Sequence, residues 1–167
     1  IGNFASAHAL TEAARSGAHV GMTYEPAMES GAMSGGRKGS AVYDIVLHGR
    51  AAHAGRAKED GRSAIEAAAE IVVSLEGLNG VREGVTFNVG KIDGGGAVNI
   101  VPDLAVVRFG ARAPDAAAAD WAQGEVERLL ARATARDGIS GHLHGGFYRP
   151  PKPRNAAQQA MFDAVAG

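Results

Sequence analysis

The stretch Gly49-Arg-Ala-Ala-His-Ala-Gly55 joins a predicted strand to a predicted helix. Residues 41–48 before it alternate between apolar and other side chains, as a half-buried strand does, and residues 61–78 after it carry apolar side chains at helical spacing. Small neighbours leave the imidazole of His53 unshielded on a loop that the following helix supports. His53 is therefore a candidate ligand-facing group, and the alternative is an ordinary loop histidine with a solvated ring.

Three further strands and a second helix are predicted in the same region. Strands are expected near residues 85–92, 98–112 (bent at Pro102) and 139–148, and a helix is expected to begin at Pro114-Asp115. The first helix is expected to pack through Ile65, Ala68, Val72 and Leu75, and the second through Ala118, Ala122, Val126, Leu129 and Ala133. The β-α-β-β-α-β order predicts an α+β, ferredoxin-like antiparallel sheet with two helices on one face, and its edge strands are free to pair with a second copy.

The composition is that of one compact domain with extensions. The chain has 167 residues, 46% of them hydrophobic, and a formal net charge of −1 from 17 basic and 18 acidic residues. It has no basic block and no apolar run of about 18 residues, which argues against nucleic acid, an anionic membrane surface or a membrane span. The absence of cysteine excludes disulfides and thiolate zinc sites but leaves the compartment open, with the cytoplasm as the default.

The two ends of the sequence are predicted to lie outside this central domain. Residue 1 is Ile rather than Met, and residues 155–167 form a predicted helix whose apolar side has no later element to cover it. The chain is therefore expected to be a fragment. Gly-rich residues 30–39 and Pro-rich residues 149–154 mark the boundaries, which predicts three segments, 1–34, 35–148 and 149–167.

Three motifs occur in a specific order and spacing: GRAAHAG…DGRSAIEAA over residues 49–68, GGGAVNIVPD over residues 94–103 and VVRFGAR over residues 106–112. Together they resemble the lid, or dimerisation, domain of the M20 family of zinc-dependent peptidases and amidohydrolases, the group that contains the glutamate carboxypeptidases. The resemblance covers approximately residues 35–148. It implies a homodimer formed through the lid, and it implies that the flanking segments are pieces of an α/β catalytic domain.

The resemblance also implies roles for individual residues. Glu25, just before the lid, matches a ligand of a site with two zinc ions, although a Glu before Pro is otherwise a solvated turn residue. His53 matches the histidine that enters the active site of the partner and stabilises the developing oxyanion. Asn99 and Arg112 match the residues that hold the substrate's free carboxylate. The implied reaction is hydrolysis of a small peptide or an N-acyl amino acid, with release of a C-terminal amino acid.

The rest of the implied active site is absent from the sequence. The family's His-x-Asp motif and its Glu-Glu pair, which contains the general base, occur nowhere in the 167 residues, so the chain as given is expected to be inactive. The family's usual serine before the histidine is Ala52 here, and its usual proline before the acidic residue is Lys58, which leaves the loop less constrained. The alternative function is a stand-alone ferredoxin-like module for oligomerisation or ligand sensing, without catalysis.

Two other patterns suggest ligand binding less directly. His142 and His144 share one face of a predicted strand, but no carboxylate lies within a few residues to complete a metal site, and they are interpreted as solvent-facing. Residues 94–96 lack the following helix and the lysine of a phosphate loop, so they are interpreted as a tight turn that lets Asn99 approach a ligand.

Overall fold

The computed structural model describes residues 6–17 and 35–166. The chain divides into two compact units, Ile1–Ser34 and Gly35–Gly167. The described part of the first unit is helix α1 (Ala7–Arg15), whose residues are all exposed, followed by Gly17 with a φ of 100°. The segment boundaries predicted from the sequence stay predictions.

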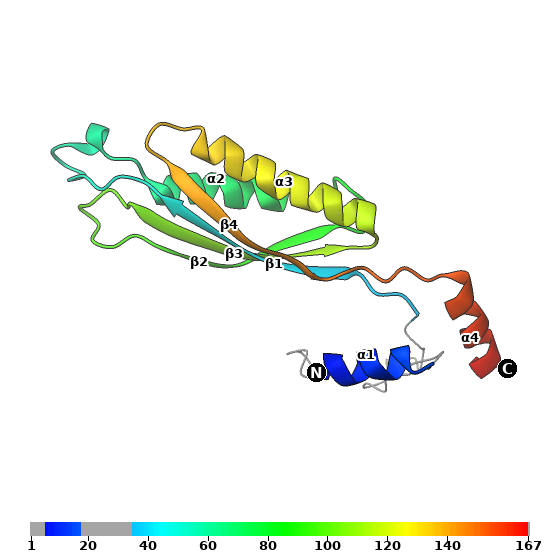
Figure 1. Ribbon diagram of the computed structural model, residues 1–167. Coiled ribbons are helices and arrows are strands. Elements are labelled where there is room, and N and C mark those ends of the chain that lie inside the picture. Colours follow the sequence, from blue (N-terminus) through cyan, green and yellow to red (C-terminus); the bar gives the residue numbers. More distant parts are fainter. Residues whose placement is uncertain (1–5, 18–34, 167) are drawn as a thin grey trace. The chain divides into compact units, whose positions relative to one another are not determined.

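The second unit is a four-stranded antiparallel sheet with the strand order β2-β3-β1-β4. Its elements are β1 (Gly39–His48), a 3₁₀ turn η1 (Lys58–Asp60), α2 (Ala64–Gly77), β2 (Thr86–Gly94), β3 (Leu104–Ala113), α3 (Ala116–Thr134), β4 (Ser140–Arg149) and α4 (Ala156–Ala166). Helices α2 and α3 lie side by side on one face of the sheet (Figure 1). The predicted ferredoxin-like α+β fold is therefore confirmed.

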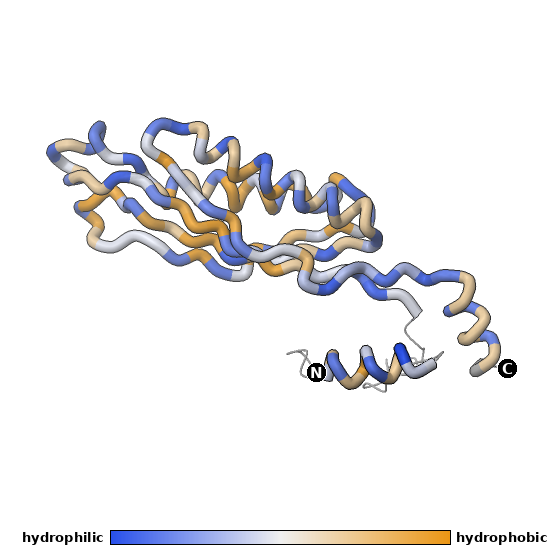
Figure 2. The backbone as a smooth tube through the Cα atoms, in the orientation of Figure 1, coloured by the Kyte–Doolittle hydropathy of each residue, from blue (hydrophilic) through white to orange (hydrophobic). Residues whose placement is uncertain are grey.

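The central strand β1 shows the predicted alternation. Ala41, Tyr43, Ile45 and Leu47 are buried against the helices, whereas Val42 and His48 on the other face are exposed. Hydrophobic residues are concentrated in the strands and in the two helices that cover them (Figure 2). One face of the sheet thus supplies the core, and the opposite face, called here the open face, is not covered by either core helix of the second unit.

Each core helix begins at a side-chain cap. The Ser63 hydroxyl accepts the N–H of Glu66 at 3.1 Å, and the Asp115 carboxylate accepts the N–H of Ala118 at 2.8 Å, so an otherwise unpaired donor of the first turn is satisfied in each helix. The whole predicted stripe of α3 is buried. These caps set where the two helices start relative to the sheet.

The predicted stripe of α2 is partly wrong. Ala68 and Leu75 are buried as expected, but Ile65 is 41% exposed, and the other buried positions are Ala64, Ala67 and Ile71. Alanines allow the helix to approach the sheet closely. Ile65 lies instead at the margin, where a Cβ on Gly95 would come within 2.8 Å of its Cδ1.

The predicted strand over residues 98–112 begins too early, because β3 starts at Leu104. The backbone of the preceding segment bonds elsewhere: the N–H of Val101 donates to Ala52 O at 2.8 Å, and Pro102 O accepts the N–H of Ala64 at 2.8 Å. These residues therefore pair with the loop after β1 and the start of α2 rather than with the sheet.

The ends of the sheet domain leave it as a two-stranded ribbon. Arg37 and Lys152 exchange backbone hydrogen bonds of 2.8 Å in both directions, beyond the ends of β1 and β4. The predicted C-terminal helix forms, and its predicted Asn155 cap accepts the N–H of Gln158 at 2.9 Å. We call the end of the sheet that carries this ribbon the hinge end. The opposite end, which carries the loop of residues 49–63, is called the tip.

Candidate functional site

His53 and Asn99 are brought together at the tip. His53 and Ile100 are opposite each other in an isolated antiparallel β-bridge. On one side of His53 the N–H of Ala54 donates to Asn99 O at 2.8 Å, and on the other side the N–H of Val101 donates to Ala52 O. Two loops that are distant in the sequence thus form a short antiparallel pair. Both His53 and Asn99 are exposed, and the backbone of each is fixed by the other loop.

The imidazole of His53 is oriented by its own loop. The N–H of Gly55 donates to Nδ1 of His53 at 3.1 Å. Because Nδ1 acts as an acceptor, the neutral ring carries its proton on Nε2, which is left as an outward hydrogen-bond donor. The His53 carbonyl accepts the N–H groups of Arg56 at 3.1 Å and Ala57 at 2.9 Å, so the backbone on the far side of the loop is also tied to this residue.

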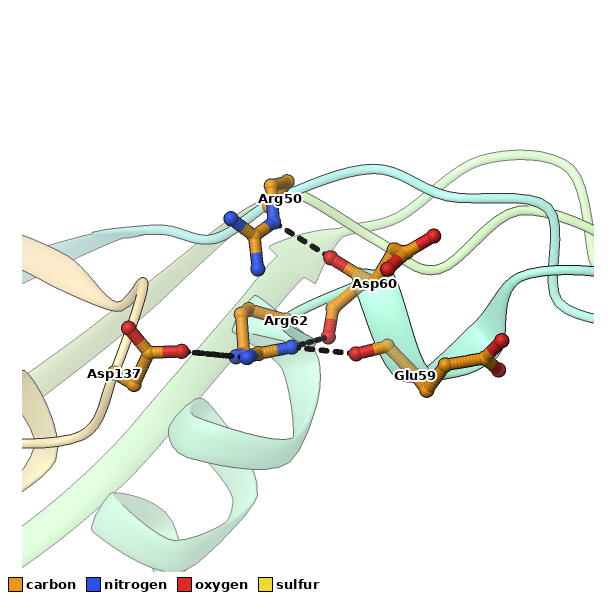
Figure 3. A network of polar contacts seen from close by, with 6 residues as sticks. Arg50, Glu59, Asp60, Arg62 and Asp137 are labelled. Carbon is orange, nitrogen blue, oxygen red and sulfur yellow. Dashed lines mark hydrogen bonds and ion pairs between the residues drawn. The ribbon is translucent and has the colours of Figure 1, made fainter.

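The base of the His53 loop is closed by two arginines. Arg50 and Arg62 exchange backbone hydrogen bonds of 2.9 Å in both directions, and Arg50 Nε donates to Asp60 O at 2.6 Å. Arg62 also donates from its guanidinium to the carbonyls of Glu59 and Gly61, each at 2.8 Å (Figure 3). The backbone carbonyls of residues 59–61 therefore all accept hydrogen bonds from the side chains of Arg50 and Arg62.

The same Arg62 guanidinium fastens the loop to the turn between α3 and β4. Its Nε and Nη2 atoms lie 3.0 and 2.5 Å from Asp137 Oδ2 (Figure 3). This hydrogen bond and the guanidinium charge hold the pKa of Asp137 below its ordinary value of 3.8. The sequence did not predict this clamp, because Arg62 and Asp137 are 75 positions apart.

Arg112 lies at the hinge end, far from His53. In β3, Leu104 pairs with His48 at the tip end, whereas Arg112 pairs with Ser40 and Thr86. At a rise of about 3.4 Å per residue, Leu104 and Arg112 are separated by roughly 27 Å along the strand. The structure therefore unites His53 with Asn99 but does not bring either of them close to Arg112 within one copy.

The described residues hold no group of three or more His, Asp or Glu side chains arranged for a metal ion. Glu25, the predicted zinc ligand, lies outside the described residues. His142 and His144 are exposed on the open face, as predicted, with ring centroids 6.5 Å apart. Among the described helices, none is both long enough and apolar enough to cross a bilayer.

The two halves of edge strand β2 differ in how their outer edge is covered. Asn79 accepts the N–H of Phe87 at 2.8 Å and donates to its carbonyl at 3.0 Å, and Glu76 accepts the N–H of Val89 at 3.2 Å. After an irregularity between Val89 and Lys91, no described side chain bonds to the backbone of residues 91–94. This second half is an open edge.

Comparison with known proteins places the sheet domain in a family. Residues 35–138 match the M20 peptidase dimerisation domain. The chain is also 33% identical over 87 residues to a Haemophilus influenzae homolog of one of the p-aminobenzoyl-glutamate hydrolase chains. These residues are 52% of this chain and 21% of that protein.

Solved structures with the same fold include three hydrolase-related proteins. An aminobenzoyl-glutamate utilization protein from Klebsiella pneumoniae matches with a TM-score of 0.67 and 24% identity, over 78% of this chain and 34% of that one. Aminopeptidase PepT from Bacillus cereus matches with a TM-score of 0.68 and 21% identity, over 78% and 35%. A tripeptidase from Staphylococcus aureus matches with a TM-score of 0.66 and 25% identity, over 79% and 36%. The chain spans about a fifth to a third of the length of these relatives.

Proposed function

Because this chain belongs to the M20 family of peptidases through its dimerisation domain, we propose that it is part of a hydrolase that cleaves a peptide or amide bond next to a free carboxylate. The relative from Haemophilus influenzae is named for a glutamate amide, which is one candidate substrate class. In this proposal the complete protein acts as a carboxypeptidase or amidohydrolase, and the present domain supplies dimerisation and substrate recognition. The observation that carries the proposal is the exposed side chain of His53, whose Nδ1 accepts the N–H of Gly55.

A metal enters the proposal only through residues outside the described part. The described residues do not form a metal site by themselves. Glu25 is proposed as one ligand of a site with two zinc ions, the other ligands belonging to other parts of the complete protein. Such ions supply an activated water when bound.

We infer that His53 donates the Nε2 proton to the oxygen of the scissile carbonyl as negative charge develops there. The bond from Gly55 removes Nδ1 as a donor and fixes the ring, so little reorganisation is needed when the charge forms. Asn99, on the adjoining loop, is in a position to bind the same substrate from the tip. Arg112 is proposed to hold the free carboxylate, since its guanidinium can donate two hydrogen bonds to one carboxylate.

The separation of His53 from Arg112 favours a site shared by two copies. A small peptide cannot reach across the roughly 27 Å that β3 spans between the two ends. If both residues contact one substrate, His53 and Asn99 come from one copy and Arg112 from its partner. A dimerisation domain makes such sharing possible.

We propose that the two copies pair through the open half of β2. An antiparallel, two-fold pairing centred on Ile92 would place Lys91 of each copy opposite Asp93 of the other, which joins unlike charges. Within one copy, Lys91 Nζ already lies 2.8 Å from Asp93 Oδ2. The two lysines and two aspartates of the dimer would therefore form one cluster of alternating charges. Ile92, 51% exposed here, would be covered at the centre.

This two-fold arrangement also suits the shared site. Antiparallel pairing reverses the strand direction, so the tip of one copy extends toward the hinge end of its partner. With Ile92 at the centre, residue 98 of one copy is level with Thr86 of the partner subunit, which pairs with Arg112 in the same sheet. His53 and Asn99 of one copy would thus lie near Arg112 of the other.

Mixing two inactive variants of the complete protein tests the shared site. His53→Ala and Arg112→Met homodimers should each be impaired, and a 1:1 mixture that exchanges protomers should regain about a quarter of the wild-type activity, because half the dimers are mixed and one of their two sites is intact. Native mass spectrometry verifies that mixed dimers form. If mixed dimers are abundant and no activity returns, the two residues do not act across the dimer.

The alternative is a stand-alone oligomerisation or ligand-sensing module. It predicts that the complete protein assembles through the β2 edge but hydrolyses no amide or peptide. Assay of the full-length protein with N-acyl amino acids and di- and tripeptides therefore separates the two functions.

A further inference from the structure

Ser40 is the one buried polar residue of the described segments, and it lies on the open face at the hinge end. In the register of the sheet, Ser40 is directly opposite Arg112 on β3 and directly opposite Arg149 on β4. Residues opposite each other on neighbouring strands point to the same face. Arg112, Ser40 and Arg149 therefore form one row across three strands, with the serine in the middle.

The burial of Ser40 indicates that its neighbours lie over it. Ser40 is only 2% exposed although α2 and α3 lie on the other face, and the long side chains opposite it are those of the two arginines. The Arg149 guanidinium is further held 5.9 Å from the ring centre of Tyr148, which lies in the bulge beside it. The register thus places two arginines on the same face of the sheet, one on each side of Ser40.

The described residues provide no carboxylate for this pair of arginines. Neither Arg112 nor Arg149 has an acidic partner among the ion pairs of the described segments, and Arg37 and Lys152 add further positive charge beyond the row. Asp115, which follows β3, caps α3 with its carboxylate. The carboxylate of Asp44, on the open face of β1, accepts a hydrogen bond from Arg108 Nε at 2.7 Å. Like charges that converge without a counterion repel one another, which favours the binding of an anion between them.

We propose that Arg149 binds a second acidic group of the substrate, beside the free carboxylate held by Arg112, so that the enzyme selects an acidic residue at the end that is released. This inference rests on the proposed function and adds a specificity-determining residue to it. One arginine can grip one carboxylate through two hydrogen bonds, so two arginines in a row match a dicarboxylate. A shallow hollow begins at Tyr148, next to Arg149 in the chain, and leaves room for the chain that joins the two groups. It is lined by Val42, Asp44, His144, residues 145–147 and Tyr148, and the carboxylate of Asp44 is already paired with Arg108.

The test compares N-acyl-glutamate with its neutral isostere N-acyl-glutamine as substrates of the full-length protein. The wild type should prefer the glutamate substrate, and Arg149→Gln should lower kcat/KM for it about 10- to 100-fold with less than about a twofold change for the glutamine substrate. Arg149→Lys should keep part of the preference. Arg112→Met should impair both substrates.

Lys152→Gln is the matched control, because it removes an exposed positive charge from the same end without touching the row. It should leave the ratio of the two kcat/KM values unchanged. Equal use of the two substrates by the wild type, or an equal loss for both in Arg149→Gln, would overturn the role of Arg149 while leaving the hydrolase proposal intact.

If the full-length protein hydrolyses neither these two substrates nor the other N-acyl amino acids and the di- and tripeptides, the proposed function fails, and equilibrium binding decides the role of Arg149. Calorimetric titration with N-acetylglutamate and N-acetylglutamine should then show tighter binding of the dicarboxylate, lost in Arg149→Gln. Equal binding of both ligands would refute the inference.

Discussion

Gly55 donates its backbone N–H to Nδ1 of His53 at 3.1 Å, and this single bond assigns the donor atom of the candidate site. A neutral imidazole has one donor and one acceptor nitrogen, so fixing Nδ1 as the acceptor leaves Nε2 as the donor. The side chain is exposed and the loop around it is bonded on both sides, which is the arrangement needed for a preformed electrostatic contact.

Replacement of His53 by Ala in the complete protein should reduce kcat about a hundredfold or more and change KM little, because an oxyanion donor acts mainly in the transition state. Steady-state kinetics with a peptide or N-acyl amino acid substrate measures both constants. Arg112→Met should instead raise KM and weaken the preference for a free carboxylate. A rise in KM alone for His53→Ala would mean that the imidazole binds substrate rather than the transition state.

The clamp at the base of the loop gives a stability prediction for this chain itself. Arg62→Met removes the donor to the carbonyls of Glu59 and Gly61 and should cost about 1 to 2 kcal/mol of unfolding free energy. Amide exchange of Ala54, Gly55 and Ala57 should also accelerate, since their bonds depend on the closed loop. Unchanged exchange at these amides would show that the loop is held without Arg62.

Asp137→Asn should have a smaller effect with a defined pH dependence. The pKa of Asp137 is lowered by Arg62, so its stabilising contribution is present above the ordinary value of 3.8 and is lost as the pH falls through the lowered pKa. The wild type should therefore be more stable than Asp137→Asn at neutral pH and equal to it well below pH 3.8. Denaturant titrations across this range measure the difference, and because Asp137 is exposed, added salt should shrink it.

Periodicity predicted the parts of the fold that depend on local pattern. The alternation around Tyr43 and the stripe through Val126 each follow from one face being buried, and both were predicted correctly. The exposure of Ile65 was not predicted. Alanines on two faces of α2 make it ambiguous which face contacts the sheet, so tertiary packing decides which residues are buried. The start of β3 was misplaced because Val101 bonds to Ala52, a partner that strand propensity does not reveal.

The candidate site, like the fold, was predictable from the sequence only in part. The family resemblance implied roles for His53, Asn99 and Arg112, and those roles stay predictions. The structure places the loops of His53 and Asn99 side by side and leaves Arg112 at the other end of the sheet. The contact of Arg62 with Asp137 joins residues 75 positions apart, so no local pattern announces it. The distance from His53 to Arg112 likewise depends on the strand register, which only the folded sheet displays.

Two glycines provide a matched test of the backbone. Gly145 has a φ of 91°, and a Cβ added to it would lie 2.1 Å from the carbonyl oxygen of Val42, so Gly145→Ala should destabilise the chain by more than about 2 kcal/mol. Gly124 lies in α3 with open space around it, so Gly124→Ala should stabilise by about 0.5 to 1 kcal/mol. Thermal and denaturant unfolding of both variants measure the two changes in stability. A Gly145→Ala chain as stable as the wild type would contradict the close approach of Gly145 to the Val42 carbonyl.

The last prediction concerns metal. The purified 167-residue chain should show no zinc-dependent peptidase or amidase activity, because its described residues form no metal site and its sequence has no Glu-Glu pair to supply a general base. Zinc should bind weakly to it, and a chelator should leave its unfolding midpoint unchanged, since the fold is held by the sheet and its two covering helices rather than by a metal. Calorimetry with zinc and thermal unfolding with and without chelator are the measurements, and Glu25→Gln is the matched variant. Zinc-dependent turnover by a homogeneous sample, lost on chelation, would require a complete active site within this chain. It would refute the proposal that this chain supplies His53 while other parts of the complete protein supply the metal site.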